Sequence, residues 1–340
     1  MCGIAGFIDF NKSSTELDIK SMITPLHHRG PDGEGTLILN NKNAIICFGH
    51  KRLSIIDLSI AGKQPMSFDN LHITYNGEIY NYQEIKKDLL ALGHNFVGES
   101  DTEIILHAFH EWGVKGVNKF IGMFAIVIFD EQKNEVHLIR DRAGVKPLFY
   151  YQKNDLILFA SELKSFHEHP QFDKELDLNA VAAFMQYGNV PTPHCIFKNC
   201  YKIKPGNYLK IDLNTKTKKE FRYWNVYDYY NKPKLNISYE DAIEKTKKIL
   251  LSAFQYRMVA DVPVGIFLSG GYDSTTVAAL LQSNSSSKLK TFTIGVPDIG
   301  LNEAPYAKDI AEHLGTDHYE INCTEKEAID MVKELSLIHI

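Results

Sequence analysis

The chain has 340 residues, a length that suits two domains better than one. Hydrophobic residues make up 44% and charged residues 23%, which is typical of folded proteins and excludes intrinsic disorder and collagen-like repeats. The net charge of −5, without a basic stripe, makes nucleic acids and anionic membranes poor candidates for partners. The sequence has no membrane-spanning apolar run and no secretion signal, and its five cysteines include no CxxC pair. We therefore expect a cytoplasmic protein of two domains.

The first two hundred residues combine short strands with helices. Apolar residues at helical spacing predict helices at 16–27, 82–92, 102–112 and 179–187. Runs of β-branched and aromatic residues between turn signals predict strands at 126–129, 136–139, 156–160 and 208–213. Asn81 with Glu84, and Ser100 with Glu103, match the capping box that begins a helix. Hairpins interleaved with helices predict an α+β domain with antiparallel sheets.

The pattern changes near residue 235. Before it lies a lysine-rich stretch, which is better interpreted as a solvated strand face and hairpin than as a phosphate-binding patch; its lysines are Lys202, Lys204, Lys210, Lys216, Lys218 and Lys219. After it we expect an amphipathic helix at 239–258 and three strand–helix units at 262–281, 290–314 and 318–335. Alternation of strand and helix predicts a parallel sheet with helices over both faces.

A cysteine directly follows the initiator methionine. Removal of Met1 would leave a thiol and a free α-amine on Cys2. An α-amine has a pKa of about 7.7–8.0, so it can accept the proton of the thiol near neutral pH. Taken alone, Cys2 is more simply an ordinary small residue, and other residues must support a catalytic role.

Four further residues each allow a structural and a functional interpretation. Asn76-Gly77 is typical of a hairpin turn, although the two amides could also stabilise an oxyanion. Arg52 is a surface charge or a clamp for a carboxylate. Asp101 is either favoured by the dipole at a helix start or holds a substrate ammonium.

Residues 264–275, VGIFLSGGYDST, run from a hydrophobic strand through a Ser-Gly-Gly turn into a helix. Adjacent glycines and a helix start favour anion binding, and the hydroxyls of Ser269, Ser274 and Thr275 add donors. Asp273 offers hard oxygen ligands suited to Mg²⁺. The loop lacks the lysine of a Walker A motif, yet it favours phosphate binding over a simple turn. His107 and His110 lie three residues apart without a suitable carboxylate, so we do not expect a metal site there.

Several motifs, in this order, resemble the class II glutamine amidotransferases and, among them, the glutamine-hydrolysing asparagine synthetases. They are MCGIAG at 1–6, HRGPD at 28–32, RLSIID at 52–57, NGEIYN at 76–81, ESDTE at 99–103, GMFA at 122–125, RDRAGVKPLFY at 140–150 and SELK at 161–164. The resemblance implies an α+β N-terminal-nucleophile hydrolase sandwich of α-β-β-α layers. An incomplete α/β parallel-sheet ATP-pyrophosphatase domain, of the adenine nucleotide alpha-hydrolase type, is implied to follow.

The resemblance also implies roles for individual residues. The cysteine matching Cys2 attacks the side-chain amide of glutamine, and the residues matching Asn76 and Gly77 hold the oxyanion. The implied glutamine-binding residues are Arg52, Leu53, Ser54, Ile55, Ile56, Glu78 and Asp101. The implied ATP-binding residues are Leu268, Ser269, Gly270, Gly271, Asp273, Ser274 and Ile294, with Asp273 as the Mg²⁺ ligand.

By this resemblance the protein would be an ATP-dependent carbon–nitrogen ligase with glutamine, aspartate and ATP as substrates, and a homodimer is possible. Ammonia released from glutamine would reach an aspartyl-AMP intermediate and give asparagine, AMP and pyrophosphate. Tyr272 replaces the leucine expected in the loop, which leaves open another acceptor carboxylate such as a sugar acid. A non-catalytic chain is the remaining alternative. The loop argues against amidotransferases that make glucosamine phosphate or phosphoribosylamine.

The implied domain limits are 2–215 for the glutaminase, 216–238 for a linker and 239–335 for the N-terminal part of the synthetase. Residues 336–340 fit no helix or strand pattern, and we expect them not to be native sequence. The family's second ATP motif, SGEGxDE, does not occur in the sequence. We therefore expect the chain as given to hydrolyse glutamine but not to make asparagine.

Overall fold

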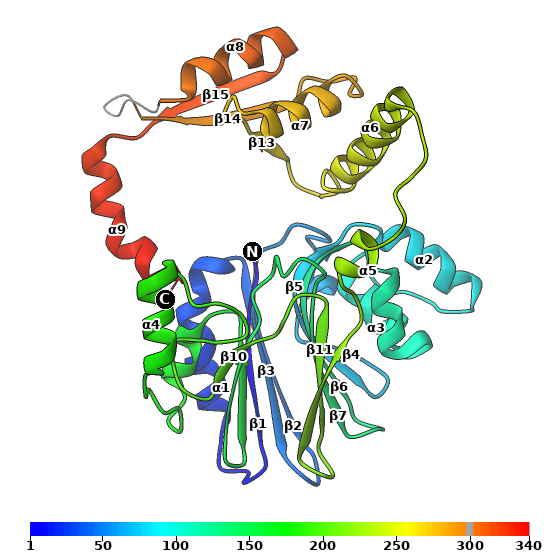
Figure 1. Ribbon diagram of the computed structural model, residues 1–340. Coiled ribbons are helices and arrows are strands. Elements are labelled where there is room, and N and C mark those ends of the chain that lie inside the picture. Colours follow the sequence, from blue (N-terminus) through cyan, green and yellow to red (C-terminus); the bar gives the residue numbers. More distant parts are fainter. Residues whose placement is uncertain (297–301, 340) are drawn as a thin grey trace. The chain divides into compact units, whose positions relative to one another are not determined.

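Figure 1 shows the computed structural model of the chain, which describes residues 1–296 and 302–339, the last seven by their backbone alone. The chain divides into two compact units, Met1–Lys232 and Pro233–Ile340, which are described separately below. No helix in the described part of the chain is long and apolar enough to cross a membrane.

One sheet of the first unit has six antiparallel strands in the order β10-β8-β9-β1-β3-β2. Their bounds are Gly3–Asp9 for β1, Gly33–Asn40 for β2, Ile45–Arg52 for β3, Phe149–Lys153 for β8, Leu156–Ala160 for β9 and Cys200–Lys202 for β10. Strand β1 is buried along its whole length between β3 and β9. Cys2 therefore lies directly before the first residue of a central, buried strand.

The second sheet of this unit is also six-stranded and antiparallel, in the order β12-β11-β7-β6-β5-β4. Its strands are β4 (Met66–Phe68), β5 (Leu71–Ile79), β6 (Gly122–Asp130), β7 (Glu135–Arg140), β11 (Asn207–Asp212) and β12 (Thr217–Arg222). The expected linker at 216–238 therefore begins too early, because β12 completes a hairpin with β11. The boundary between the units falls after Lys232 instead.

Hydrophobic side chains join the two sheets face to face. Ile4, Phe48 and Phe159 of the first sheet form one core cluster with Val127 and Leu138 of the second, and all five are 0% exposed. Each such side chain contributes about 1.5–3 kcal/mol by leaving water. This shared core fixes the two sheets against each other, so residues at their edges keep defined positions.

Helices cover the outer faces of the sheets (Figure 1). Helix α1 (Glu16–Ile23) packs Ile19 and Met22 against Phe7 and Cys47 of the first sheet. Helix α2 (Tyr82–Ala91) contacts α3 (Asp101–Trp112), and α3 contacts β4 and β5 of the second sheet. The remaining helices of this unit are α4 (Leu178–Tyr187) and the short α5 (Tyr227–Tyr230). The expected α-β-β-α order of layers is thus confirmed.

The end of one helix and the start of another differ from the sequence prediction. Helix α1 ends at Ile23, and Thr24–Arg29 continue as a 3-10 turn that contains Pro25, which lacks the amide that a longer helix would need. Asn81 does not cap α2, because its side-chain amide bonds the backbone of Lys119 and Ile121. Ser100 caps α3 as predicted, by accepting a hydrogen bond from the amide of Glu103.

The second unit begins with the amphipathic helix α6 (Tyr239–Tyr256) and contains a parallel sheet in the order β13-β14-β15. Its elements are β13 (Gly265–Phe267), α7 (Tyr272–Gln282), β14 (Lys290–Gly295), α8 (Ala304–Leu314), β15 (Asp317–Asn322) and α9 (Glu325–His339). The predicted strand–helix units are confirmed. Helix α9 runs on through most of the doubtful tail at 336–340, of which Ile340 lies outside the described residues.

The parallel sheet is covered on one face only. Leu268, Ala278, Ala307 and Ala311 form a small core cluster on the side of α7 and α8. On the opposite face Phe267 is 81%, Ile294 57% and Ile321 62% exposed. The expectation that helices cover both faces is therefore wrong for the residues that the structure describes.

Candidate active site of the first unit

Cys2 is held at the mouth of a pocket in the first unit. Its Sγ accepts a hydrogen bond from the amide of Leu53 at 3.3 Å and lies 3.6 Å from the carbonyl oxygen of the same residue. The carbonyl of Cys2 accepts a bond of 2.9 Å from Arg29, which is itself paired with Glu162 at 2.7 Å. Burial raises the pKa of the Cys2 thiol, whereas the bond from Leu53 lowers it. The thiol is therefore fixed in position but needs a base or a nearby cation to ionise.

Sixteen residues line this pocket. They are Met1, Cys2, Arg52, Leu53, Ile55, Ile56, Gly62, Gln64, Tyr75, Asn76, Gly77, Glu78, Ser100, Asp101, Thr102 and Lys146. Of the residues predicted for the glutaminase site, only Ser54 is missing from the lining. Its amide donates instead to Asp32 at 2.8 Å, which shapes the loop around its neighbours Leu53 and Ile55.

Asn76 and Gly77 lie inside strand β5 rather than on a hairpin turn, and the turn interpretation of this pair is wrong. They pair with Ala125 and Phe124 of β6, so the sheet holds their backbone extended. Asn76 is 1% exposed, and neither its Nδ2 nor its Oδ1 has a hydrogen-bond partner in the described part of the chain. A buried amide without a partner is costly, so this one is available to bind a ligand. A side chain at position 77 would lie 2.3 Å from the carbonyl of Met123, which requires glycine there.

Arg52 is the last residue of β3, and the loop that follows folds back over its guanidinium. The guanidinium donates to the carbonyl oxygens of Asp57 and of Ser59, the latter at 2.8 Å. A Cβ atom on Gly62 would lie 2.3 Å from Nη2, so glycine leaves the room that this arrangement needs. The loop thus holds a fixed cation in the lining of the pocket, which a ligand carboxylate could approach.

Asp101 is a buried carboxyl group at the start of helix α3, where the helix dipole favours negative charge. Its Oδ2 accepts bonds from the hydroxyl of Tyr75 at 2.8 Å and from the amide of Ile79 at 3.0 Å. Burial raises the pKa of Asp101 to about 6, with Glu78 adding to the rise. Burial also raises the pKa of Glu78, against the charge of Lys146. Two carboxyl groups share the pocket, so a bound ammonium group would stabilise their charged forms.

The pocket stands where the two sheets meet. Thr74 of β5 donates to the carbonyl of Gly49 of β3 at 3.3 Å, and a ring nitrogen of His50 lies 3.2 Å from the carbonyl of Tyr75. Burial lowers the pKa of His50 to about 3, so its ring is neutral and donates this bond. Because these bonds join β3 to β5, Arg52 at the end of one strand keeps its place beside Asn76 on the other.

Sequence reasoning assigned no site role to Gln64, Tyr75 and Lys146, although all three line the pocket. Gln64 accepts a bond from the amide of Tyr75 at 2.6 Å and donates to Thr102 at 3.1 Å. Nothing near Gln64 or Tyr75 in the sequence distinguishes them from ordinary core residues. Lys146 does lie in one of the motifs that carry the family resemblance, and that motif was the available signal.

In the second unit, the Ser-Gly-Gly turn lies between β13 and α7. Gly270 has a φ of 82°, a left-handed conformation that favours glycine, and Gly271 precedes the first turn of α7. The hydroxyls of Ser269 and Ser274 lie 3.1 Å apart, and the Oγ1 of Thr275 is buried without a partner in the described residues. The turn has the form of an anion cradle. The side chain of Leu268 is buried in the small core, so only its backbone can reach a ligand, whereas Ile294 is 57% exposed.

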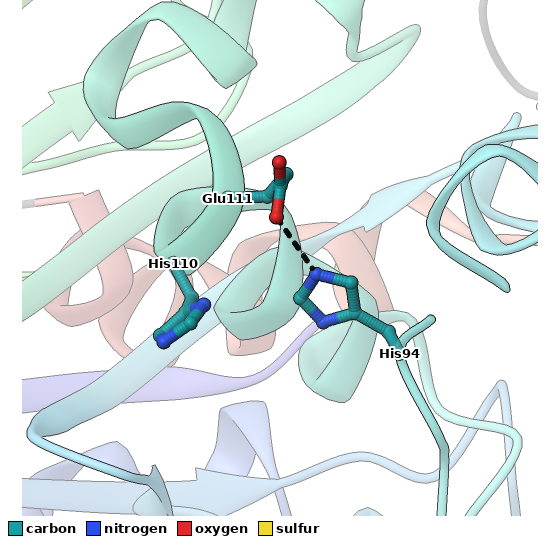
Figure 2. A group of neighbouring side chains, drawn as sticks. All are labelled: His94, His110 and Glu111. Carbon is teal, nitrogen blue, oxygen red and sulfur yellow. Dashed lines mark hydrogen bonds and ion pairs between the residues drawn. The ribbon is translucent and has the colours of Figure 1, made fainter. Parts of the chain in front are cut away.

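Histidines and a carboxylate gather at the end of helix α3 (Figure 2). His94, His110 and Glu111 offer ligand atoms within 4.8 Å of one another. Hydrogen bonds account for the most buried of these groups, because Nε2 of His94 lies 3.1 Å from Glu111 and its Nδ1 lies 2.9 Å from Nδ1 of His107. His110 lies 3.6 Å from Asp69. The cluster can therefore be explained as a hydrogen-bonded chain, and the prediction of no metal site at His107 and His110 stays a prediction.

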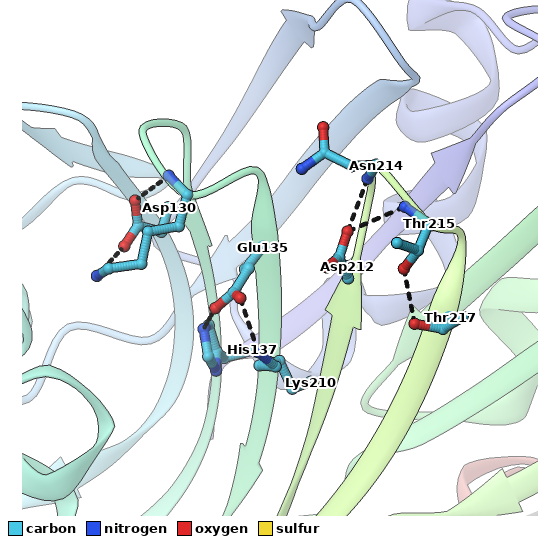
Figure 3. A network of polar contacts seen from close by, with 9 residues as sticks. Asp130, Glu135, His137, Lys210, Asp212, Asn214, Thr215 and Thr217 are labelled. Carbon is cyan, nitrogen blue, oxygen red and sulfur yellow. Dashed lines mark hydrogen bonds and ion pairs between the residues drawn. The ribbon is translucent and has the colours of Figure 1, made fainter.

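The lysine-rich stretch forms a strand face and hairpin, as predicted. Lys210 of β11 binds Glu135 of β7 at 2.7 Å, while Asp212 caps the following turn through the amides of Asn214 and Thr215 (Figure 3). Other lysines of the stretch are paired in the same way, Lys204 with Glu220 and Lys216 with Asp155. Three of the six lysines thus have a carboxylate partner, whereas Lys202 bonds the carbonyl of Val190 and Lys218 and Lys219 lie over aromatic rings.

Comparisons with known proteins agree with the geometry of the first unit. The family described as "Glutamine amidotransferase domain" matches residues 1–224, and the family described as "Asparagine synthase" matches residues 245–338. The chain is 38% identical to "Putative asparagine synthetase 2 (glutamine-hydrolyzing)" of Methanocaldococcus jannaschii, over 100% of the chain and 68% of that protein.

Two further relatives are matched over a smaller part of their own length. The chain is 32% identical to asparagine synthetase 3 (glutamine-hydrolyzing) of Bacillus subtilis, over 99% of the chain and 57% of the relative. It is 32% identical to "Amidase chry2" of Gibberella zeae, over 98% of the chain and 53% of that protein. The chain thus spans between about half and two thirds of the length of these relatives. It belongs to the family of glutamine-hydrolysing asparagine synthetases.

Proposed function

We propose that the first unit is an N-terminal-nucleophile glutaminase that releases ammonia from the side chain of glutamine. The observation that carries this proposal is the buried, unpartnered amide of Asn76 in the same pocket as the Cys2 thiol. An unpaired donor beside a nucleophile suits the stabilisation of an oxyanion. Removal of Met1 would free the α-amine of Cys2 as the base that takes the proton of the thiol.

The residues of the pocket then have distinct roles. The Cys2 thiolate attacks the amide carbon of glutamine, and the amides of Asn76 and Gly77 stabilise the oxyanion that forms. The α-amine returns its proton to the leaving nitrogen, which departs as ammonia and leaves a thioester that water hydrolyses to glutamate. Arg52 binds the α-carboxylate of the substrate, and Asp101 with Glu78 binds its α-ammonium group. The backbone at 53–56 closes one side of the pocket.

The second unit would bind ATP at the Ser-Gly-Gly turn. Gly270, Gly271 and the start of α7 can hold phosphate groups, and Ser269 and Ser274 add hydroxyl donors. Asp273 lies in the first turn of α7, is exposed, and offers oxygen ligands for Mg²⁺. Bound ATP would supply activation of a carboxylate with release of pyrophosphate. These features fit an ATP-pyrophosphatase domain of the adenine nucleotide alpha-hydrolase type.

For the whole protein we propose asparagine synthesis, with ammonia from glutamine passing to an activated aspartate. Another acceptor carboxylate is the second candidate. Tyr272, in place of the expected leucine, is 95% exposed beside the phosphate turn, and one relative is named an amidase. A cytoplasmic location and a homodimer remain predictions, as does the expectation that the 340-residue chain alone hydrolyses glutamine without making asparagine.

Release of glutamate from glutamine tests the glutaminase proposal. C2A should abolish it and leave glutamine binding, whereas C323S, which removes a half-buried thiol of the second unit, should leave the rate unchanged. Glutamate release by C2A equal to that of the parent chain would refute the assignment. Pyrophosphate release from ATP, with and without aspartate and in a longer chain if this one is inactive, separates aspartate from other acceptors.

A further inference from the structure

Lys146 is a buried cation in the pocket of the nucleophile. It is 2% exposed and lines the pocket together with Cys2 and Glu78. Within the described part of the chain its Nζ takes part in no hydrogen bond or ion pair, whereas its backbone amide and carbonyl bond the side chains of Asp141 and Arg140. A largely buried ammonium group that lines a pocket is a candidate for a functional position.

The loop that carries Lys146 is built to hold it there. The carboxylate of Asp141 accepts four backbone amides, those of Phe124, Ala143, Val145 and Lys146, at 2.9–3.2 Å. The guanidinium of Arg140 donates to three carbonyl oxygens, those of Gly144, Lys146 and Ile203, at 2.7–2.9 Å. Because the side chains of Arg140 and Asp141 bond backbone groups, they fix the loop but do not pair with the ammonium group of Lys146.

The other charged groups around the pocket are already balanced or face the substrate. Arg29 is neutralised by its ion pair with Glu162. The carboxylate of Asp141 accepts hydrogen bonds from backbone amides, whereas Glu78 and Asp101 are the two carboxyl groups that would bind glutamine. Burial lowers the pKa of Lys146, and Glu78 opposes this by favouring the charged form. Arg52 and Lys146 are the two cationic side chains in the lining. Because Arg52 is assigned to the substrate carboxylate, Lys146 remains to act on the nucleophile.

The charge of Lys146 acts on both ionisable groups at the start of the chain. Burial raises the pKa of the Cys2 thiol and the charge of Asp101 raises it further, whereas the charge of Lys146 lowers it. Burial lowers the pKa of the Met1 α-amine, which stands one residue before the α-amine that removal of Met1 would expose, and the charges of Lys146 and Arg29 lower it further. A fixed cation therefore shifts the thiol and the amine in the direction that nucleophilic attack requires.

We propose that Lys146 is a positioning residue whose ammonium charge favours the thiolate of Cys2 and the neutral α-amine, so that the pair is ready to attack glutamine. The inference rests on the proposed glutaminase function of the same pocket. It also gives a purpose to the RDRAGVKPLFY motif at 140–150, because Arg140 and Asp141 hold the loop on which the lysine stands.

The test is the pH dependence of Cys2 alkylation by iodoacetamide in the parent chain, K146M and K146R. The modified N-terminal peptide is quantified by mass spectrometry, which also verifies that Met1 has been removed. We expect K146M to raise the midpoint by about one pH unit. The tenfold loss of thiolate below the midpoint is offset in part by the greater reactivity of a more basic thiolate, so the rate should fall about three- to fourfold. K146R keeps the charge and should keep the midpoint within about 0.3 unit.

Controls separate charge from packing. K202M removes a half-buried lysine outside the pocket, whose pKa is also lowered by burial, and should leave the midpoint unchanged. Alkylation of Cys323 in the second unit should be equal in all variants. An unchanged midpoint in K146M, or an equal shift in K146R, would overturn the inference. If the parent chain releases no glutamate but the midpoint still shifts as expected, the glutaminase proposal fails and the role of Lys146 toward the thiol stands.

Discussion

The carboxyl group of Asp101 should make the first unit less stable as the pH rises. Burial raises its pKa to about 6 in the folded chain, from an ordinary value of 3.8. The folded state therefore holds a proton that the unfolded state has released between about pH 4 and pH 6, and the free energy of unfolding falls across this range. The charged carboxylate in the pocket therefore lowers the free energy of unfolding at neutral pH.

The size of this effect follows from the shift. A shift of about two pKa units lowers the free energy of unfolding by about 3 kcal/mol at pH 8, where the group is charged in both the folded and the unfolded state. At pH 4.5 the same shift lowers the free energy of unfolding by only about 1 kcal/mol, because the group is still protonated in the folded state. D101N removes the titration and keeps an oxygen for the bonds from Tyr75 and Ile79. Its unfolding free energy, relative to the parent chain, should therefore grow by about 2 kcal/mol from pH 4.5 to pH 8.

Tryptophan fluorescence can follow this change in one unit alone. The chain has two tryptophans, Trp112 and Trp224, and both lie in the first unit. Urea titrations of D101N and of the parent chain at pH 4.5, 6 and 8 give the pH dependence of the difference. D101N should also bind glutamine more weakly, because the amide cannot pair with the α-ammonium group.

D9N is the matched control, because Asp9 is also buried in the first unit but is fully hydrogen-bonded. Burial acts to raise the pKa of Asp9, but bonds from Ser13, Ser14 and the amide of Asn11 outweigh it and lower the pKa. D9N should therefore lower the unfolding free energy at pH 8, the opposite sign. A difference between D101N and the parent chain that stays constant with pH would refute the linkage argument.

Two further changes test the two candidate sites separately. N76A should lower kcat for glutamate release by about 10²–10³-fold with little change in KM, because the amide acts on the oxyanion alone. N76A should not lower the unfolding free energy, since the amide has no hydrogen-bond partner to lose. A large loss of stability in N76A would show that the amide is structural. G270A forces a side chain into a left-handed residue and against Tyr306, at 2.9 Å, so it should abolish ATP binding measured by calorimetry while glutamate release stays unchanged.

The family resemblance implied the α-β-β-α layers, whereas hydrophobic periodicity predicted most of the individual strands and helices. The strands at 136–139 and 156–160 were found within one residue, since each is a run of buried side chains, whereas the strand predicted at 126–129 begins four residues earlier, at Gly122. Asn76-Gly77 was misplaced because turn propensity is a local signal, whereas pairing with β6 is made with residues almost fifty positions away. Asn81 failed as a cap for the same reason, since Lys119 and Ile121 compete for its side chain.

The site was predicted only where motifs carried it. Family motifs identified Cys2, Arg52 and Asp101, but composition and spacing left each of them with a simpler interpretation. Gln64 and Tyr75 could not be found, because their role depends on a contact between β5 and the loop before β4. Partners of this kind are set by tertiary packing and have no signature along the chain.

Two polar groups in the pocket of the first unit point to where binding energy is used. Elsewhere in the unit, the buried charges of Arg29 and Asp141 are held by an ion pair with Glu162 and by four backbone amides, respectively. Inside the pocket, the side-chain amide of Asn76 has no hydrogen-bond partner among the described residues, and burial raises the pKa of the Asp101 carboxyl group to about 6. Each of them costs stability until a ligand supplies the missing charge or hydrogen bond. Glutamine, by pairing with these groups, should therefore stabilise the first unit as it binds.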